Sequence, residues 1–381
     1  SLRRRLADLV PQVPLDIEFA IDAKSKIHLL QVRRITTSHK WDDVINESVN
    51  SSMTFLKSYV SDIMKPRDGL FGTRTLLGFM PDWNPAELIG IVPRPLAMSL
   101  YRHLITKSNW RIARESMGYR KMPNTELMLS LYGRPYIDVR NSFNSFLPEG
   151  LTPQVCEKLI NGYLDRLDKK PFLHDKVEFD VVFTALDFTF RQEFLRRYPN
   201  LLSQDEMDSY ENSLRGLTIN AITGDSFNEA MHRITQLEIL QKKSDYSAIV
   251  DSFSIVDRIN TLLIECSELG TLPFAVIARH AFIAENILRS AVSQGVLTES
   301  RLNQLRLSIS TISGQMSSDY DKFSSGTITK EDFLGTYGHL RPSSYDILSP
   351  NYSQRPEILI RERSDMQSSK QNRIEDFTFT E

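Results

Sequence analysis

Cysteine is scarce in this chain, which has only Cys156 and Cys266 among its 381 residues. Each lies in an apolar stretch with helical spacing, and the two are far apart in the sequence. A disulfide-stapled secreted domain needs several closely spaced cysteines, so that class is excluded. No Cys and His spacing is typical of a zinc site either. We interpret both residues as buried or inactive thiols of a reducing compartment and expect a cytoplasmic protein.

An excess of one charge is also lacking, because 46 Lys and Arg residues face 48 Asp and Glu residues. A chain with a net charge of -2 has no overall positive electrostatic potential that would attract nucleic acid, so we expect no nucleic-acid partner. No apolar run approaches the roughly 18 residues of a membrane-spanning helix, so we expect no membrane segment. Glycine-rich phosphate loops of the Walker or dinucleotide type are absent too. The composition, with 41% hydrophobic and 25% charged residues, is that of an ordinary globular protein.

The first 40 residues differ in pattern from the rest of the chain. Residues 15–34 read as two short strands around a polar turn, which predicts a β-hairpin. Two strands alone are marginally stable, so this hairpin should belong to a larger sheet. Because the chain also starts at Ser1 rather than Met, we expect it to be either a piece of a longer protein or a processed chain. A polar hinge follows at 36–40.

Helical signals dominate from residue 41 onward. A loosely kept apolar stripe at helical spacing predicts the first helix, with Val44, Val49, Met53, Leu56 and Val60 on one side. Residues 64–100 are rich in proline and glycine but also in aromatic residues, which favours an ordered irregular loop over a linker. Long runs at 226–266 and 273–316 have helical spacing.

Three helix starts can be placed from their capping residues. Thr152 followed by Pro153 predicts an N-cap with proline at the first helical position. Ser203 and Glu206 match a capping box, and Gly216 is a plausible end of that helix. Thr329 with Asp332 gives a weaker signal for a short final helix.

The predicted fold class is therefore mainly α, with a large helical domain preceded by a short β-hairpin. We expect the hairpin part to cover residues 1–40, the helical domain residues 41–350, and a polar tail or linker residues 351–381. We find no internal repeat.

Two segments of the hairpin match a known family. The runs Asp16-Ile-Glu-Phe-Ala-Ile-Asp22 and Leu30-Gln-Val-Arg33 resemble the final ATP-grasp strands of the phosphoenolpyruvate synthase and pyruvate phosphate dikinase family. That family has D-I-E-W-A-x-D, followed about a dozen residues later by L-x-Q-x-R-P. Arg34 stands here in place of the family proline.

Three further islands are similar to the central helical domain of phosphoenolpyruvate synthase-like proteins, a layout that rifampicin phosphotransferase shares. They are Met80–Gly90, Tyr132–Asp138 and Tyr337–Pro350. The last island departs from a Gly-His-Arg run, because Leu340 is inserted between His339 and Arg341.

The resemblance implies an ATP-dependent phosphotransferase that passes a phosphoryl group from ATP through a phosphohistidine to a small-molecule acceptor. It implies Glu18 as a Mg²⁺ ligand, and Gln31 and Arg33 as contacts to the ATP phosphates. Residues 1–40 would be the end of the ATP-grasp domain and residues 41–350 the acceptor-binding domain. The ATP-grasp body and the phosphohistidine domain would be partners from the same protein, and the chain alone should be inactive. The alternative is a non-catalytic helical binding or scaffold module.

Several residues of the helical part are candidates for the acceptor site. Trp83, Asn84 and Glu87 either line a pocket or cap the helical core and satisfy helix ends. Arg111 and Arg114 either seat an anionic group or lie on a solvated helix face. Arg134, beside Tyr136, either lines the same cavity or belongs to a turn between a helix and a strand.

The segment after the last predicted helix supplies the final candidates. His339 and Arg341 lie two apart in a segment that we expect to be extended before Pro342, so they should point the same way. His339 could deprotonate an acceptor hydroxyl while Arg341 steadies the phosphoryl group. Alternatively, both tie the last helix to the core through backbone carbonyls. We expect His280 to be a partnered core or helix-face histidine rather than a catalyst.

Overall fold

The computed structural model describes residues 15–22, 26–34, 43–243, 252–309, 312–341 and 350–354. It is mainly helical, with 62% helix and 7% strand, which confirms the predicted fold class. Contacts divide the chain into two units, residues 1–62 and residues 63–381. This division falls near the end of the first helix, whereas the sequence predicted a boundary after residue 40.

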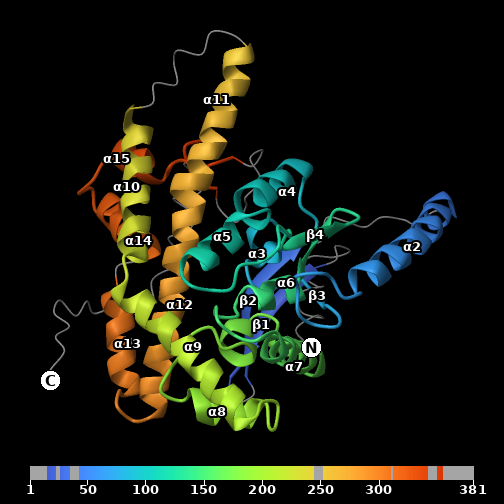
Figure 1. Ribbon diagram of the computed structural model, residues 1–381. Helices are drawn as coiled ribbons and strands as arrows, with labels where there is room; N and C mark the ends of the chain where they lie inside the picture. The colour runs from blue at the N-terminus through green and yellow to red at the C-terminus, as the bar shows by residue number, and fades with distance from the viewer. Residues whose placement is uncertain are drawn as a thin grey trace. The chain divides into compact units, whose positions relative to one another are not determined.

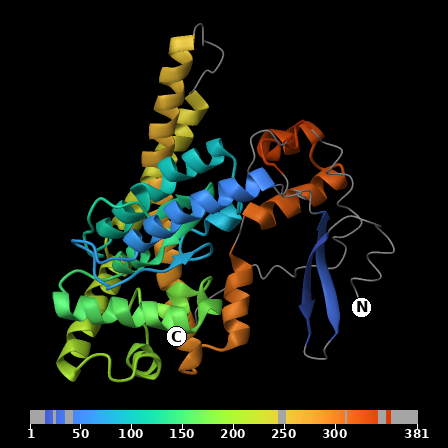
Figure 2. The same ribbon diagram turned by 90° about the vertical axis from the view of Figure 1, so that its right-hand side faces the viewer.

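The first unit contains the predicted hairpin. Strands β1 (Leu15–Ile21) and β2 (Ile27–Arg34) pair antiparallel and run side by side in Figure 2. At the end of β1, Asp22 accepts a hydrogen bond from the Lys26 backbone amide at 2.9 Å and lies 2.9 Å from His28 Nε2, which links the two strands. The long helix α2 (Asp43–Ile63) follows and confirms the first helix predicted from the sequence, although Val49 and Met53 of its apolar stripe are exposed.

The second unit holds a small sheet and the remaining helices (Figure 1). Its sheet has the antiparallel order β3-β5-β4, and its π-helical or 3₁₀ turns are labelled η. The elements up to residue 181 are β3 (Leu77–Gly78), α3 (Pro85–Leu88), α4 (Pro95–Tyr101), η1 (Arg102–Thr106), α5 (Asn109–Ser116), β4 (Met128–Leu131), β5 (Arg134–Asp138), α6 (Val139–Asn144), α7 (Pro153–Lys169), η2 (Pro171–Leu173) and η3 (Val177–Val181).

The elements that follow are all helical. They are α8 (Phe190–Arg197), α9 (Gln204–Thr223), α10 (Ser226–Lys243), α11 (Ser252–Glu265), η5 (Cys266–Thr271), α12 (Leu272–Ser293), α13 (Glu299–Ser308), α14 (Ile312–Ser324) and α15 (Lys330–Tyr337).

Local capping chemistry explains where several helices begin. The Thr152 hydroxyl accepts from the Val155 amide at 3.4 Å, with Pro153 at the first helical position. Ser203 and Glu206 form the reciprocal capping box of α9, as predicted. Thr329 and Asp332 form a second capping box at α15. The predicted end at Gly216 is wrong, because α9 continues past it to Thr223.

The main hydrophobic core lies among α5, α6, α7, η3, α8, α9 and α12. On α7 the residues that face inward recur every three or four positions, as an amphipathic helix requires. A second cluster around Trp110 and Ile137 lies under the small sheet. Cys156 is buried in the main core, and burial raises the pKa of its thiol to about 11, which agrees with an unreactive thiol.

A third cluster forms where the chain returns to α15. Tyr352 is buried with Phe333 and Tyr337, and its amide donates to the Leu340 carbonyl at 3.0 Å. Ser353 likewise donates to the Gly338 carbonyl at 3.0 Å. The described start of the predicted tail, residues 351–354, is therefore packed on the end of α15.

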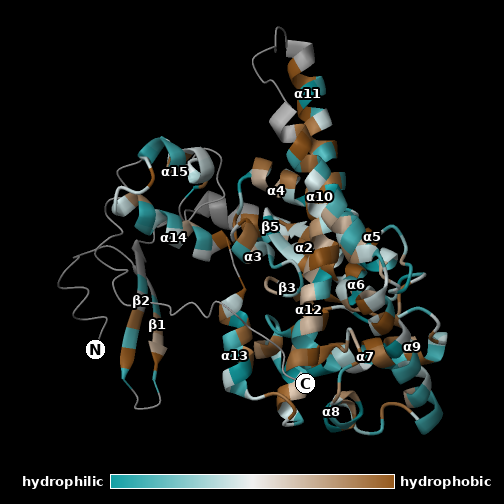
Figure 3. Cartoon of the chain, turned by 90° about the vertical axis from the view of Figure 1, so that its left-hand side faces the viewer, coloured by the Kyte–Doolittle hydropathy of each residue, from teal (hydrophilic) through white to brown (hydrophobic). Residues whose placement is uncertain are grey.

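One continuous helical run, Ile255–Ser293, is long and apolar enough to cross a membrane by length and composition alone. It joins α11, η5 and α12, and Figure 3 shows hydrophobic residues interspersed with polar ones along it. Core helices meet the same criterion, and α12 packs against α5 and α10. The expected absence of a membrane segment therefore stays a prediction.

Candidate functional site

Two of the sequence islands lie side by side in the second unit. β3 pairs with β5, α3 contacts β5, and the rings of Phe79 and Tyr136 are 4.4 Å apart. The island Met80–Gly90 therefore adjoins the island Tyr132–Asp138. Between β4 and β5, Tyr132 and Gly133 both have positive φ, at 50° and 77°, as a two-residue hairpin turn requires. This turn joins two strands, not a helix and a strand.

A buried carboxylate, Asp82, ties the first island to the helices behind it. Arg114 donates to both carboxylate oxygens of Asp82, at 2.5 and 2.9 Å, and Ser142 Oγ donates at 2.6 Å. The Asp82 side chain is only 2% exposed. Arg114 also donates to Ser145 Oγ at 2.6 Å, and its guanidinium lies 3.9 Å from the Phe146 ring. A bidentate pair of this kind fixes the geometry of the loop.

The predicted anion-binding pair is thus engaged inside the protein. Arg114 is buried with Asp82, and Arg111 donates to Glu115 at 3.1 Å and to Asn124 at 3.3 Å. Neither of the two alternatives read from the sequence described Arg114, since it lies in the interior. Sequence reasoning missed Asp82, although an aspartate between Pro81 and Trp83 in an apolar loop was a usable signal.

A second buried network lies behind β5. Asp138 is fully buried and accepts from Thr75 Oγ1 at 2.6 Å, while its Oδ2 has no hydrogen-bond partner and lies 3.9 Å from Arg67 Nη1. Arg140, also fully buried, donates to the carbonyls of Ile63 and Lys65 at 3.0 and 2.8 Å. Burial lowers the pKa of the Arg140 guanidinium. These groups clamp the irregular segment after α2 onto the core.

The loop residues Trp83, Asn84 and Glu87 match the structural alternative in part. Asn84, with φ 38°, caps α3 by accepting from the Glu87 amide at 3.1 Å. Trp83 is half-buried between the two larger clusters, and its carbonyl accepts from Tyr101 Oη at 3.0 Å. Glu87 is exposed on α3. Arg134 is exposed at the start of β5.

The hairpin pairs its candidate residues across the two strands. Glu18 pairs directly with Gln31, and Asp16 pairs with Arg33 two positions along. A bulge follows Glu18, and both Glu18 and Gln31 are exposed. Within the described residues, no group of three or more His, Cys, Asp or Glu side chains could hold a metal ion. The carboxylate of Glu18 is the type of oxygen ligand that Mg²⁺ prefers, but the described part of the hairpin does not form a complete metal site.

His339 and Arg341 follow α15 directly. His339 is exposed, and Arg341 Nη1 donates to the His339 carbonyl at 3.4 Å. This contact lies within one short segment and does not link α15 to the core, so both alternatives read from the sequence stay predictions. Residues 342–349, which belong to the same island, lie outside the described part of the chain.

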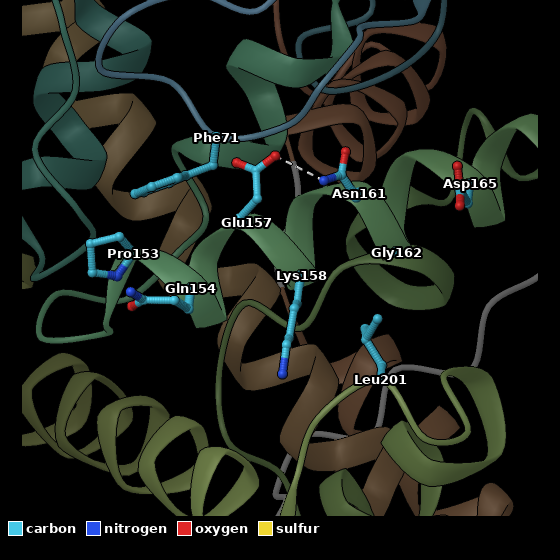
Figure 4. Close-up of a pocket in the computed structure, with 9 residues that line it drawn as sticks. All are labelled: Phe71, Pro153, Gln154, Glu157, Lys158, Asn161, Gly162, Asp165 and Leu201. Atoms are coloured by element: carbon cyan, nitrogen blue, oxygen red, sulfur yellow. Dashed lines mark hydrogen bonds between the residues drawn. The ribbon is translucent and has the colours of Figure 1, made fainter.

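A groove of about 720 Å³ runs along the exposed side of α7 (Figure 4). Glu157 accepts from the Gly72 amide at 2.9 Å and from Asn161 Nδ2 at 2.9 Å. Lys158 donates to Glu206 at 2.7 Å. Phe71 and Leu201 supply its apolar walls. Sequence analysis did not find this groove, because its parts come from segments far apart in the chain.

Comparison with known proteins adds no relative: no family model, no curated protein and no solved structure matches this chain.

Proposed function

We propose that this chain supplies the last strands of the nucleotide site and the acceptor-binding domain of an ATP-dependent phosphotransferase similar to phosphoenolpyruvate synthase. The observation that carries the proposal is the hairpin register, in which Glu18 lies opposite Gln31 and Asp16 opposite Arg33. A mainly helical domain follows, in the order that the family layout requires.

In this proposal the hairpin forms one wall of the nucleotide site. Glu18 supplies a carboxylate to Mg²⁺, the Gln31 amide and Arg33 contact the ATP phosphates, and the other ligands come from the ATP-grasp body. The metal ion would neutralise charge on the transferred phosphoryl group. A phosphohistidine domain of the same protein would then carry the phosphoryl group to the acceptor.

The acceptor step is assigned to the helical unit. His339 accepts the proton of an acceptor hydroxyl, and Arg341 steadies the phosphoryl group. The adjacency of Arg341 to the His339 carbonyl supports a common position for the pair. The groove along α7 and the loop with Trp83, Glu87 and Arg134 are the surfaces offered to an acceptor.

A second candidate is a non-catalytic helical binding or scaffold module. The observation that favours it is that Arg114, Arg111 and Asn84 form hydrogen bonds within the protein. These polar groups therefore stabilise the fold instead of facing a ligand. The two candidates differ in whether ATP labels the protein.

The test is autophosphorylation of the whole protein that carries this chain, with Mg²⁺ and ATP labelled at the β or γ phosphorus. The expected result is an acid-labile phosphohistidine in the wild type and a strong loss in Glu18→Gln, because an amide is a poorer metal ligand. Glu149→Gln, the same change at another exposed carboxylate, is the matched control and should label normally. Equal labelling of Glu18→Gln and wild type would remove Glu18 from the site, and no labelling of any variant would favour the binding module.

The acceptor step is tested on the labelled protein with pyruvate, glucose and 1-naphthol as probes. His339→Ala should label normally and then discharge its phosphoryl group about 10²-fold more slowly than wild type, the usual scale for loss of a general base. A large drop in thermal stability with discharge preserved would assign His339 to structure instead.

A further inference from the structure

A second cavity, of about 520 Å³, lies among α9, α10 and α12. Its walls are largely apolar and are formed by Ile222, Phe227, Ile283, Ala284, Ile287 and Leu288, among others. Among the residues that the structure describes, no charged side chain lines it. Cavities of about 300–1,000 Å³ with apolar walls and few polar groups are the usual size and chemistry of small-molecule sites.

The mouth of this cavity keeps large apolar side chains in contact with water. Ile222 is 66% exposed and Phe227 is 42% exposed. Both lie beside the turn between α9 and α10, where a Cβ on Gly224 would meet the Asn220 carbonyl oxygen at 2.6 Å. The turn is thus fixed by a close backbone approach. The exposed apolar side chains at the mouth therefore lie on a turn with a fixed backbone conformation.

One end of the cavity is polar. His280, on α12, has its Nε2 3.0 Å from Ser226 Oγ at the start of α10, and its ring meets the Phe227 ring edge-on at 5.5 Å. This contact confirms that His280 is partnered. Among the described residues its second ring nitrogen, Nδ1, has no hydrogen-bond partner.

Arg279, the residue before His280, does not line the cavity. Arg279 is buried, forms an ion pair with Glu178 and lies 4.8 Å from the Phe282 ring. Burial, and then the nearby Arg279 charge, lower the pKa of His280. At neutral pH the imidazole is therefore uncharged, and it can donate or accept one further hydrogen bond.

We propose that this cavity binds an uncharged, mainly apolar small molecule that carries a hydroxyl group, with the hydroxyl hydrogen-bonded to His280. The apolar walls take the hydrocarbon part, and the absence of charged lining residues disfavours ions. The groove along α7 has a different chemistry, since charged side chains, among them Glu157, Lys158 and Asp165, line it. Binding stands independently of the proposed function; only a role of the ligand as the phosphoryl acceptor rests on it.

The test is calorimetry on the full chain with 1-naphthol, which has an apolar ring system and one hydroxyl, and with 1-methylnaphthalene, which lacks the hydroxyl. For a ligand of this size we expect a Kd for 1-naphthol of roughly 10 µM to 1 mM. His280→Leu should weaken 1-naphthol about 3- to 10-fold, the net worth of one hydrogen bond, and leave 1-methylnaphthalene nearly unchanged.

Ala284→Trp fills the cavity from its wall and should weaken both probes at least about tenfold, because the lost apolar contact is large. Ala281→Trp is the matched control, on an exposed position of the same helix outside the lining, and should bind both probes like wild type. Circular dichroism and the melting temperature confirm that each variant is folded. No binding of either probe to wild type, or equal binding by Ala284→Trp and wild type, would overturn the proposal. An unchanged 1-naphthol affinity in His280→Leu would overturn the assignment of the hydroxyl.

Discussion

The Asp82–Arg114 pair gives the sharpest prediction about what holds the second unit together. We expect Asp82→Asn to lower the free energy of unfolding by about 3–5 kcal/mol, the cost of removing one partner of a buried ion pair. Asparagine keeps the size of the side chain and tolerates the positive φ of 59°, so the loss is electrostatic. The guanidinium of Arg114 would be left buried without its countercharge.

Replacing both partners separates this cost from the worth of the pair. In Asp82→Asn combined with Arg114→Met the unpaired charge is gone, so the double variant should lose clearly less than the sum of the two single variants. Arg196→Gln is the control, because Arg196 pairs with Glu193 on the surface and its side chain is 63% exposed. A surface pair of this kind is worth about 0–1 kcal/mol.

Urea unfolding followed by tryptophan fluorescence measures these energies. Trp110 is 1% exposed, and its ring lies 5.7 Å from the Arg114 guanidinium, so it reports on this region. The reasoning would be refuted by a loss below about 1 kcal/mol for Asp82→Asn, the level of a surface pair. Strict additivity in the double variant would refute it as well.

Two further predictions follow from single positions. Gly216→Ala should raise the free energy of unfolding by about 0.5–1 kcal/mol, because alanine is a better helix former than glycine. Gly216 is exposed inside α9, and a Cβ there would meet nothing within 4 Å. A lower midpoint of unfolding in urea would contradict this prediction. Burial, and then the nearby Arg279 charge, hold the pKa of His280 in the folded protein below its ordinary value of 6.5, so the unfolded chain binds more protons and stability should fall as the pH drops below 6.5. His280→Gln should flatten this part of the melting-temperature profile between pH 7 and 5, and an unchanged slope would show that His280 does not cause it.

Local signals predicted much of the fold. The caps at Thr152, Ser203 and Thr329 were read correctly because an N-cap depends on a few neighbouring residues. The hairpin itself was predicted because two short strand patterns flank a polar turn, whereas the bulge after Glu18 was not. Gly216 misled the reading of α9, because an exposed glycine costs a long, well-packed helix too little to end it.

Long-range contacts explain what the sequence did not predict. Asp82 contacts Arg114, 32 positions away, and Ser142, 60 positions away. The residues next to each of the three give no signal that predicts these contacts. Gly338, at the end of α15, has an ordinary helical φ of -62° and is not needed for an unusual turn. Glycine is needed there for a different reason, since a Cβ would collide with the Leu334 carbonyl oxygen of the preceding helical turn and with Ser353 Oγ on the returning chain. Tyr352 likewise joins the last cluster through packing that composition cannot reveal.

The most direct test of the central claim is phosphorus-31 NMR of the whole protein that carries this chain, mixed with Mg²⁺ and a small excess of ATP. The account predicts that ATP resonances fall by about one equivalent per protein while a phosphoramidate resonance appears, as phosphoryl transfer to a histidine requires. The resonance should vanish on brief acid treatment. An ATP spectrum that stays unchanged with folded protein would contradict a phosphotransferase and leave a helical binding module.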